Sequence, residues 1–89
     1  MSERPAHNPR FNFVEVGSES ILYDNETHNV IYLDQPASVV WFLCDGVRDI
    51  PEIAKLIADA YPDQRTTIAD DVKATIEDLA KKGALDLLS

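Results

Sequence analysis

The stretch Trp41-Phe42-Leu43-Cys44-Asp45-Gly46 divides the chain into a first half with strand-like patterns and a second half with helical ones. An apolar helix is expected to end at this Asp-Gly turn, because glycine adopts the positive φ that terminates a helix at little cost. Helical periodicity returns shortly after the turn. This order predicts an α+β fold, winged-helix-like, in which an N-terminal three-stranded antiparallel sheet packs on three helices.

The composition predicts one acidic globular domain. With 89 residues and a hydrophobic content of 45%, the chain has room for a single core. Its 16 Asp and Glu against 8 Lys and Arg give a net charge of -8, which repels nucleic acid and anionic membranes and favours basic partners. The single cysteine, and the lack of an apolar run typical of a membrane span or a secretory signal, lead us to expect a cytoplasmic protein.

Short β-strands are predicted in the first half of the chain. Residues 1–10 contain two prolines and no apolar pattern, so we expect a flexible N-terminal tail ahead of a single domain over residues 11–89. The strands are predicted at residues 11–16, 20–23 and 30–33. The Asp and Asn of Asp24-Asn25-Glu26-Thr27 are typical of a turn, which would join the second strand to the third.

Helices are predicted from capping residues and apolar spacing. We expect N-terminal caps at Asp34, Asp49 and Thr67. Glu52 follows Asp49 at the spacing of a capping box. Gly83 is placed to end the third helix, and residues 84–88 are predicted to form a short final strand.

Residue types that carry out catalysis are not combined into a recognisable site. Cys44 lies on the apolar face of its predicted helix, so we interpret it as a buried small hydrophobe rather than a nucleophile. His7 and His28 are too far apart in sequence to suggest metal ligands. The acidic pairs Asp70-Asp71 and Glu77-Asp78 are typical of a solvated helix face. We therefore expect neither catalytic activity nor a cofactor nor a metal.

The predicted strand at residues 30–33 is apolar on both of its faces, whereas a half-exposed strand normally alternates. Two interpretations remain open from the residues alone. The N-terminal segments cover the second face, or the strand forms an open sheet edge beside an apolar cleft that accepts an extended peptide. Two interpretations also remain open for Trp41, which lies one position off the apolar face of its predicted helix. Its side chain either anchors a partner or is partly buried in the core.

Several short motifs follow one another in a particular order along most of the chain. They include Leu43-Cys44-Asp45-Gly46, Glu52-Ile53, Tyr61-Pro62 and Lys82-Gly83-Ala84-Leu85. In this order the chain resembles the PqqD-like family, the peptide-recognition elements of pathways for ribosomally synthesised, post-translationally modified peptides, whose named member acts in pyrroloquinoline quinone synthesis. The resemblance implies a winged-helix-like protein without catalytic activity. Such a protein binds the leader segment of a precursor peptide as an added strand and presents it to a modifying enzyme, often a radical S-adenosylmethionine protein.

Carried over by position, the resemblance implies a peptide-binding cleft between the third strand and the third helix. The implied residues are Asn29, Val30, Ile31, Tyr32 and Leu33 on the strand and Asp71, Thr75, Ile76, Asp78 and Leu79 on the helix. Leu33-Asp34 stands where the family usually has Leu-Asn, and the following Gln35-Pro36-Ala37 is less typical. These departures leave open whether the pathway makes pyrroloquinoline quinone or another peptide product.

Two other functions are compatible with the predicted architecture. A winged-helix regulator would place its third helix in the major groove of DNA, but this helix carries two acidic pairs against three lysines, so no nucleic acid partner is expected. A structural subunit would dimerise by pairing residues 30–33 with a second copy. Such a homodimer is compatible with peptide binding at the same edge. No membrane partner is expected.

Overall fold

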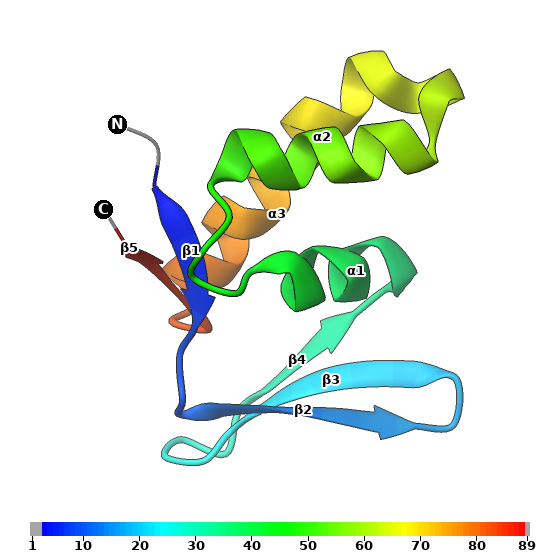
Figure 1. Ribbon diagram of the computed structural model, residues 1–89. Helices are drawn as coiled ribbons and strands as arrows, with labels where there is room; N and C mark the ends of the chain where they lie inside the picture. Colours follow the sequence, from blue (N-terminus) through cyan, green and yellow to red (C-terminus); the bar gives the residue numbers. More distant parts are fainter. Residues whose placement is uncertain (1–2, 89) are drawn as a thin grey trace.

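The computed structural model describes residues 3–88, apart from the side chains of residues 65 and 66. Two antiparallel sheets and three α-helices make up the described part of the chain (Figure 1). The elements, in order, are β1 (Arg4–His7), β2 (Phe11–Val16), β3 (Glu19–Asp24), β4 (Val30–Leu33), α1 (Gln35–Leu43), α2 (Ile50–Ala60), the short 3₁₀ helix η1 (Pro62–Gln64), α3 (Arg65–Lys81) and β5 (Leu85–Leu88). The predicted α+β class and the three-stranded sheet are therefore confirmed.

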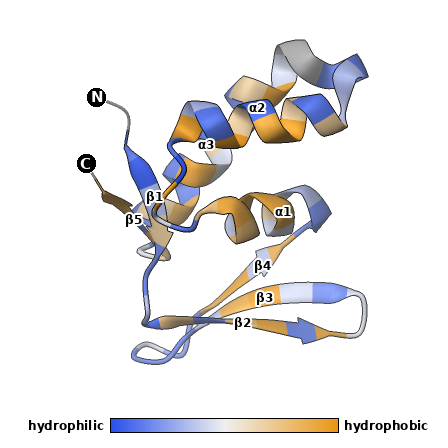
Figure 2. Ribbon diagram, in the orientation of Figure 1, coloured by the Kyte–Doolittle hydropathy of each residue, from blue (hydrophilic) through white to orange (hydrophobic). Residues whose placement is uncertain are grey.

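The three-stranded sheet is a meander in the order β2-β3-β4, and its inner face meets the helices. Alternate residues on each strand, such as Phe11, Leu22 and Leu33, are buried on that face. The same core takes buried side chains from all three α-helices. Figure 2 shows that α1 is hydrophobic over most of its length, as expected for a helix packed between the sheet and the other helices.

The predicted helix ends are largely confirmed. The Asp34 carboxylate accepts a hydrogen bond from the Ala37 amide at 2.8 Å and begins α1. Asp49 and Glu52 form the reciprocal capping box that begins α2. Gly46 has a φ of 81° and lies in the turn that separates these two helices.

Thr67 does not cap α3, so that prediction is wrong. The helix begins at Arg65, because η1 leads directly into it and extends it toward the N-terminus. Thr67 then lies within the first turn, where its hydroxyl donates a hydrogen bond to the Gln64 carbonyl at 3.1 Å. A threonine in this position satisfies its own hydroxyl instead of accepting from a backbone amide.

The N-terminal segment also differs from the expectation of a flexible tail. Arg4–His7 form β1, which pairs with β5 over its whole length. Pro5 is almost fully buried, and its carbonyl accepts a hydrogen bond from the Gly46 amide at 2.8 Å. Residues 4–10 are therefore part of the domain, because the late strand β5 supplies pairing that no local pattern reveals. Met1 and Ser2 lie outside the described residues.

Trp41 belongs to the core. Its side chain is only 2% exposed and stacks in parallel on the His7 ring, with 3.7 Å between ring centroids. Burial thus decides between the two interpretations of this residue, and the neighbouring Phe42 is instead exposed. Among the described residues no helix combines the length and hydrophobicity that crossing a membrane requires.

Candidate functional site

The outer edge of β4 is open in the described part of the chain, since β4 pairs with β3 alone. The Asp24 amide donates a hydrogen bond to the Asn29 carbonyl at 2.9 Å. With the register of the two strands, this bond shows which residues of β4 direct their backbone groups toward β3. Inner and outer backbone groups alternate along such a pair of antiparallel strands. The N–H and C=O groups of Val30 and Tyr32 therefore point away from β3, where an added strand would pair with them.

A groove of about 280 Å³ lies beside this edge, between β4 and α3. Its lining comes from β4, from the start of α1 and from one face of α3: Ile31, Tyr32, Leu33, Asp34, Ala37, Ala74, Thr75, Asp78, Leu79 and Lys82. Buried Leu33 and Leu79 make its apolar floor, while the exposed ion pair between Lys82 Nζ and Asp78 Oδ2, 2.9 Å apart, lies at its rim. We call this the β4–α3 groove.

The structure brings most of the predicted peptide-contacting residues to this groove and places the others elsewhere. Ile31, Tyr32, Leu33, Thr75, Asp78 and Leu79 all line it. Asn29 lies in the preceding turn, and Val30 points to the opposite face of the sheet, where it is 41% exposed. Ile76 is fully buried in the core, and Asp71 lines a neighbouring pocket instead. A role in peptide binding stays a prediction for all ten.

The groove also contains residues that sequence reasoning missed. These include Ala74 on α3 and Lys82 directly after its end, four residues before and after Asp78, so helical spacing from Asp78 was a signal for both. Asp34 and Ala37 line the groove from the junction of β4 with α1. Asp34 was predicted as a helix cap, and its second location, at a groove, follows from the direct connection between the strand and the helix.

A second pocket, of about 360 Å³ and larger than the groove, adjoins the groove and lies between α1, α2, η1 and α3. It is lined by Gln35, Pro36, Val39, Val40, Ile57, Tyr61, Gln64, Ile68, Asp71, Val72 and Thr75. Thr75 lines both cavities. We call this cavity the interhelical pocket.

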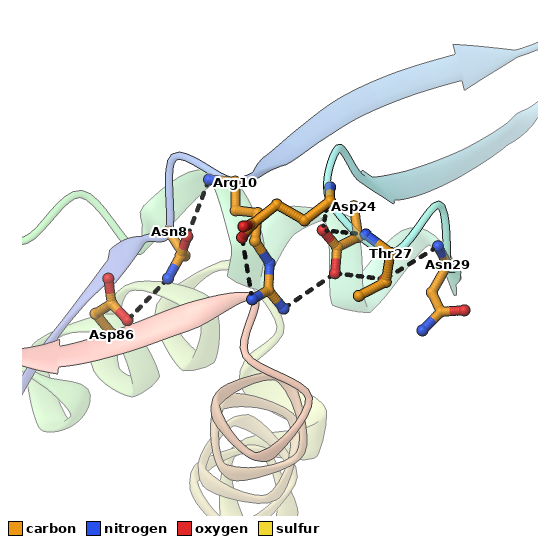
Figure 3. A network of polar contacts seen from close by, with 7 residues as sticks. Asn8, Arg10, Asp24, Thr27, Asn29 and Asp86 are labelled. Carbon is orange, nitrogen blue, oxygen red and sulfur yellow. Dashed lines mark hydrogen bonds and ion pairs between the residues drawn. The ribbon is translucent and has the colours of Figure 1, made fainter.

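The turn before β4 is fixed by a polar network around the buried Asp24 (Figure 3). Its carboxylate accepts hydrogen bonds from the Glu26 and Thr27 amides and from the Thr27 hydroxyl. Arg10 Nη2 lies 3.0 Å from Asp24 Oδ2 and its Nη1 lies 3.4 Å from Glu26. Burial alone raises the pKa of Asp24, but these hydrogen bonds and the Arg10 charge outweigh it and hold that pKa below its usual range. The turn is thus held in one conformation directly beside the open edge.

Cys44 is fully buried, which confirms its interpretation as a small hydrophobe. Its Sγ donates to the Val40 carbonyl, 3.1 Å away. Removal from water, with a smaller contribution from the Asp45 charge, raises the pKa of the thiol to about 12, so the reactive thiolate is not formed near neutral pH. Within residues 3–88 no group of three His, Cys, Asp or Glu side chains is arranged to hold a metal ion.

Comparison with known proteins agrees with this geometry. The family model described as "Coenzyme PQQ synthesis protein D (PqqD)" matches residues 19–85, which include β4, the groove and all three helices. The chain belongs to the PqqD family. This membership confirms the resemblance found in the sequence.

Relatives of this PqqD-family chain include proteins named "PqqA binding protein" from Rhodopseudomonas palustris. The one from strain TIE-1 is 36% identical over 81 residues, which cover 91% of this chain and 76% of the relative. The one from strain BisB5 is 39% identical over 56 residues, 63% of this chain and 55% of the relative.

A solved structure, "TbiB1 in Complex with the TbiA(beta) Leader Peptide", has the same fold, with a TM-score of 0.76. The similarity covers 91% of this chain and 94% of TbiB1, at 23% sequence identity. At that identity the likeness concerns the fold alone. It shows that the strands and helices of this PqqD-family chain are arranged as in a protein solved with a leader peptide.

Proposed function

We propose that this protein is a peptide-binding adaptor, which captures the leader segment of a precursor peptide as an added strand on β4 and presents it to a modifying enzyme. The observation that carries the proposal is the open edge of β4 beside the β4–α3 groove. The relatives named PqqA binding proteins and the TbiB1 structure with its leader peptide support it. The pathway makes pyrroloquinoline quinone or another modified peptide, in the cytoplasm.

Strand addition divides recognition between backbone and side chains. The outward groups of Val30 and Tyr32 supply hydrogen bonds to the peptide backbone, independently of its sequence. Alternate side chains of the added strand point into the groove, toward Leu33 and Leu79, so these positions determine selectivity. Ordering a flexible leader costs about 2–5 kcal/mol, so binding depends on a few apolar anchors in the groove.

Charge favours a basic leader. The chain carries a net charge of -8, and two carboxylates, Asp34 and Asp78, line the groove against the single cation of Lys82. Lys or Arg residues next to the apolar anchors would accelerate encounter and add selectivity, and added salt would reduce both effects.

In this proposal the partner enzyme carries out the modification of the bound peptide. We infer that this enzyme belongs to the radical S-adenosylmethionine class. An adaptor accelerates the reaction by raising the effective concentration of the peptide beside the enzyme. Peptide incubated with this protein alone should keep its mass, whereas addition of the enzyme should modify it. A change of mass without the enzyme would contradict the non-catalytic part of the proposal.

An NMR titration tests the adaptor function. Isotope-labelled protein is mixed with the leader peptide of a precursor encoded beside its gene, and a scrambled peptide and a DNA duplex serve as controls. We expect amide shifts at residues 30–33 and on the groove face of α3 with the leader only. No shift at high excess, or shifts confined to α2, would contradict strand addition. Shifts with the duplex would favour the nucleic-acid alternative, and sedimentation of the free protein tests for a dimer.

A further inference from the structure

The interhelical pocket is larger than the β4–α3 groove, yet strand addition on β4 leaves it unused. Its volume of about 360 Å³ lies within the range of about 300–1,000 Å³ that is typical of ligand sites. The walls come mainly from apolar side chains, among them Val39, Ile57 and Val72. Its polar lining residues Gln35, Gln64 and Asp71 are exposed, so they lie toward the solvent-facing side. The pocket therefore suits an apolar group with a charged neighbour.

The interhelical pocket continues the β4–α3 groove along α3. The groove takes Asp78 and Ala74, and the pocket takes Val72 and Ile68, which lie progressively nearer the start of the helix. Thr75 lines both cavities at the point where they meet. α3 runs from beside α2 toward β5, while β4 leads into α1 (Figure 1). The two cavities thus form one path that passes the end of β4.

The start of α1 borders both cavities as well. Asp34 and Ala37 face the groove, whereas Pro36 and Val39 face the pocket. A peptide strand paired with β4 and extended beyond Leu33 would therefore cross the first turn of α1 and arrive at the pocket. This continuity identifies the occupant as a part of the same peptide.

We propose that the interhelical pocket binds one bulky apolar side chain, aromatic or long aliphatic, from the peptide segment that extends beyond Leu33. Asp71, exposed beside the pocket, pairs with a Lys or Arg next to that anchor. The inference rests on the proposed adaptor function and adds a second selectivity site to it. A leader that fills the groove alone would bind more weakly than one that fills both cavities.

Val39→Phe tests the pocket without altering the groove. Val39 is half-buried and lines only the interhelical pocket, so a phenyl ring there fills the space that the anchor would take. Val47→Phe is the matched control, because Val47 is 73% exposed and lines neither cavity. By calorimetry with the leader peptide encoded beside the gene, we expect Val39→Phe to raise Kd roughly 10- to 100-fold and Val47→Phe to leave it unchanged.

The peptide side of the contact is tested by replacing each bulky apolar leader residue with alanine. One such replacement should weaken binding to the wild type by a similar factor and have little further effect on Val39→Phe. Methyl-labelled wild-type protein gives an independent measurement, which does not depend on the folding of any variant. The methyl groups of Ile57 and Ile68 should shift when the leader is added.

The outcomes separate the pocket from the adaptor function. If the leader shifts the amides of β4 while the Ile57 and Ile68 methyl groups stay in place and Val39→Phe binds like the wild type, the pocket proposal is wrong and the adaptor function stands. If the leader shifts neither set, the adaptor function fails and the pocket proposal fails with it.

Discussion

The turn that joins β3 to β4 and the strand β4 itself are consecutive in the chain, but they use their hydrogen-bonding groups differently. In the turn, Asp24 accepts hydrogen bonds from two amides and a hydroxyl and pairs with Arg10. Along β4, the outward backbone groups of Val30 and Tyr32 have no strand partner among the described residues. A turn held by these hydrogen bonds therefore leads directly into an unpaired edge, so we expect the edge to be ordered before a peptide arrives. Preorganisation of this kind reduces the entropic cost of binding.

Removing one outward donor from β4 should have the largest effect. Tyr32→Pro deletes an N–H that faces the added strand, and the peptide carbonyl left without a partner should raise Kd roughly 10- to 100-fold. Tyr32→Ala keeps the donor and separates the contribution of the side chain. Calorimetry with the leader peptide measures Kd for the wild type, Tyr32→Pro and Tyr32→Ala.

Glu15→Pro is the matched control for the proline itself. The Asn25 amide donates a hydrogen bond to the Arg10 carbonyl at 3.0 Å. Because inward and outward backbone groups alternate from this pair along β2, the N–H and C=O groups of Glu15 point away from β3. This proline sits at the opposite edge of the same sheet. Equal affinities for the two proline variants, both folded, would show that the edge of β4 does not pair with the peptide.

Loss of the buried carboxylate should produce the next largest effect, on stability. Asp24→Ala removes the buried partner of the Arg10 guanidinium and the acceptor of the turn amides, and we expect Tm to fall by roughly 10 °C or more. Glu26→Ala removes only the exposed partner of the same arginine and should cost a few degrees at most. Thermal unfolding followed by circular dichroism compares them. A similar, small change in both variants would show that Asp24 does not hold the turn.

The same carboxylate should make stability depend on pH in the acid range. The pKa of Asp24 is lower in the folded protein than in the unfolded chain, where it is about 3.9. Its contribution is therefore complete above about pH 4 and is lost as the pH falls through the lowered, folded-state pKa. Hydrogen bonds from the Arg48 and Val47 amides also lower the pKa of Asp45, so its contribution to stability is lost at acid pH in the same way. Calorimetric scans between pH 2 and 7 should show that Asp24→Asn loses less stability on acidification than the wild type does. If the stability of both proteins fell in parallel with pH, this assignment would be contradicted.

Local patterns were sufficient to predict the strands β2 to β4, the caps Asp34 and Asp49, and the burial of Cys44. Each depends on residues within one or two turns of the position concerned. β1 was missed because its strand conformation depends on β5, at the other end of the chain. No apolar alternation marks it, and its pairing and the His7–Trp41 stack join segments that are distant in sequence.

The candidate site was predicted equally well on the strand and on the helix, because three of the five residues predicted on each line the groove. Side-chain alternation predicts that Tyr32 shares the face of Val30, but it does not show that Tyr32 borders the groove while Val30 does not. α3 contacts α1, α2 and β5, and its apolar surface is therefore broad. Sequence spacing alone did not show which part of that surface meets β4. For this reason Ile76, a core residue, was predicted at the groove, while Ala74 and Lys82 were missed.

The smallest expected effect concerns the rim of the groove, where pairing is present but weak. Lys82 and Asp78 form an exposed pair one helical turn apart, so Lys82→Ala should change the free energy of unfolding by less than about 0.5 kcal/mol. The same change frees the Asp78 carboxylate beside the peptide. A basic leader should then bind a few-fold more tightly at low salt, and the gain should disappear at high salt.

Lys81→Ala is the matched control for this change in net charge, because Lys81 is exposed on the same helix but does not line the groove. Affinity measured at two salt concentrations for both variants separates a local effect from a general one. Equal gains would mean that the peptide responds only to the net charge of the protein. Weaker binding by Lys82→Ala would mean that the lysine itself contacts the peptide, so the leader would present an acidic or carbonyl group at this rim. The direction of this small change in affinity therefore shows whether charge at the rim of the groove contributes to peptide recognition in addition to shape.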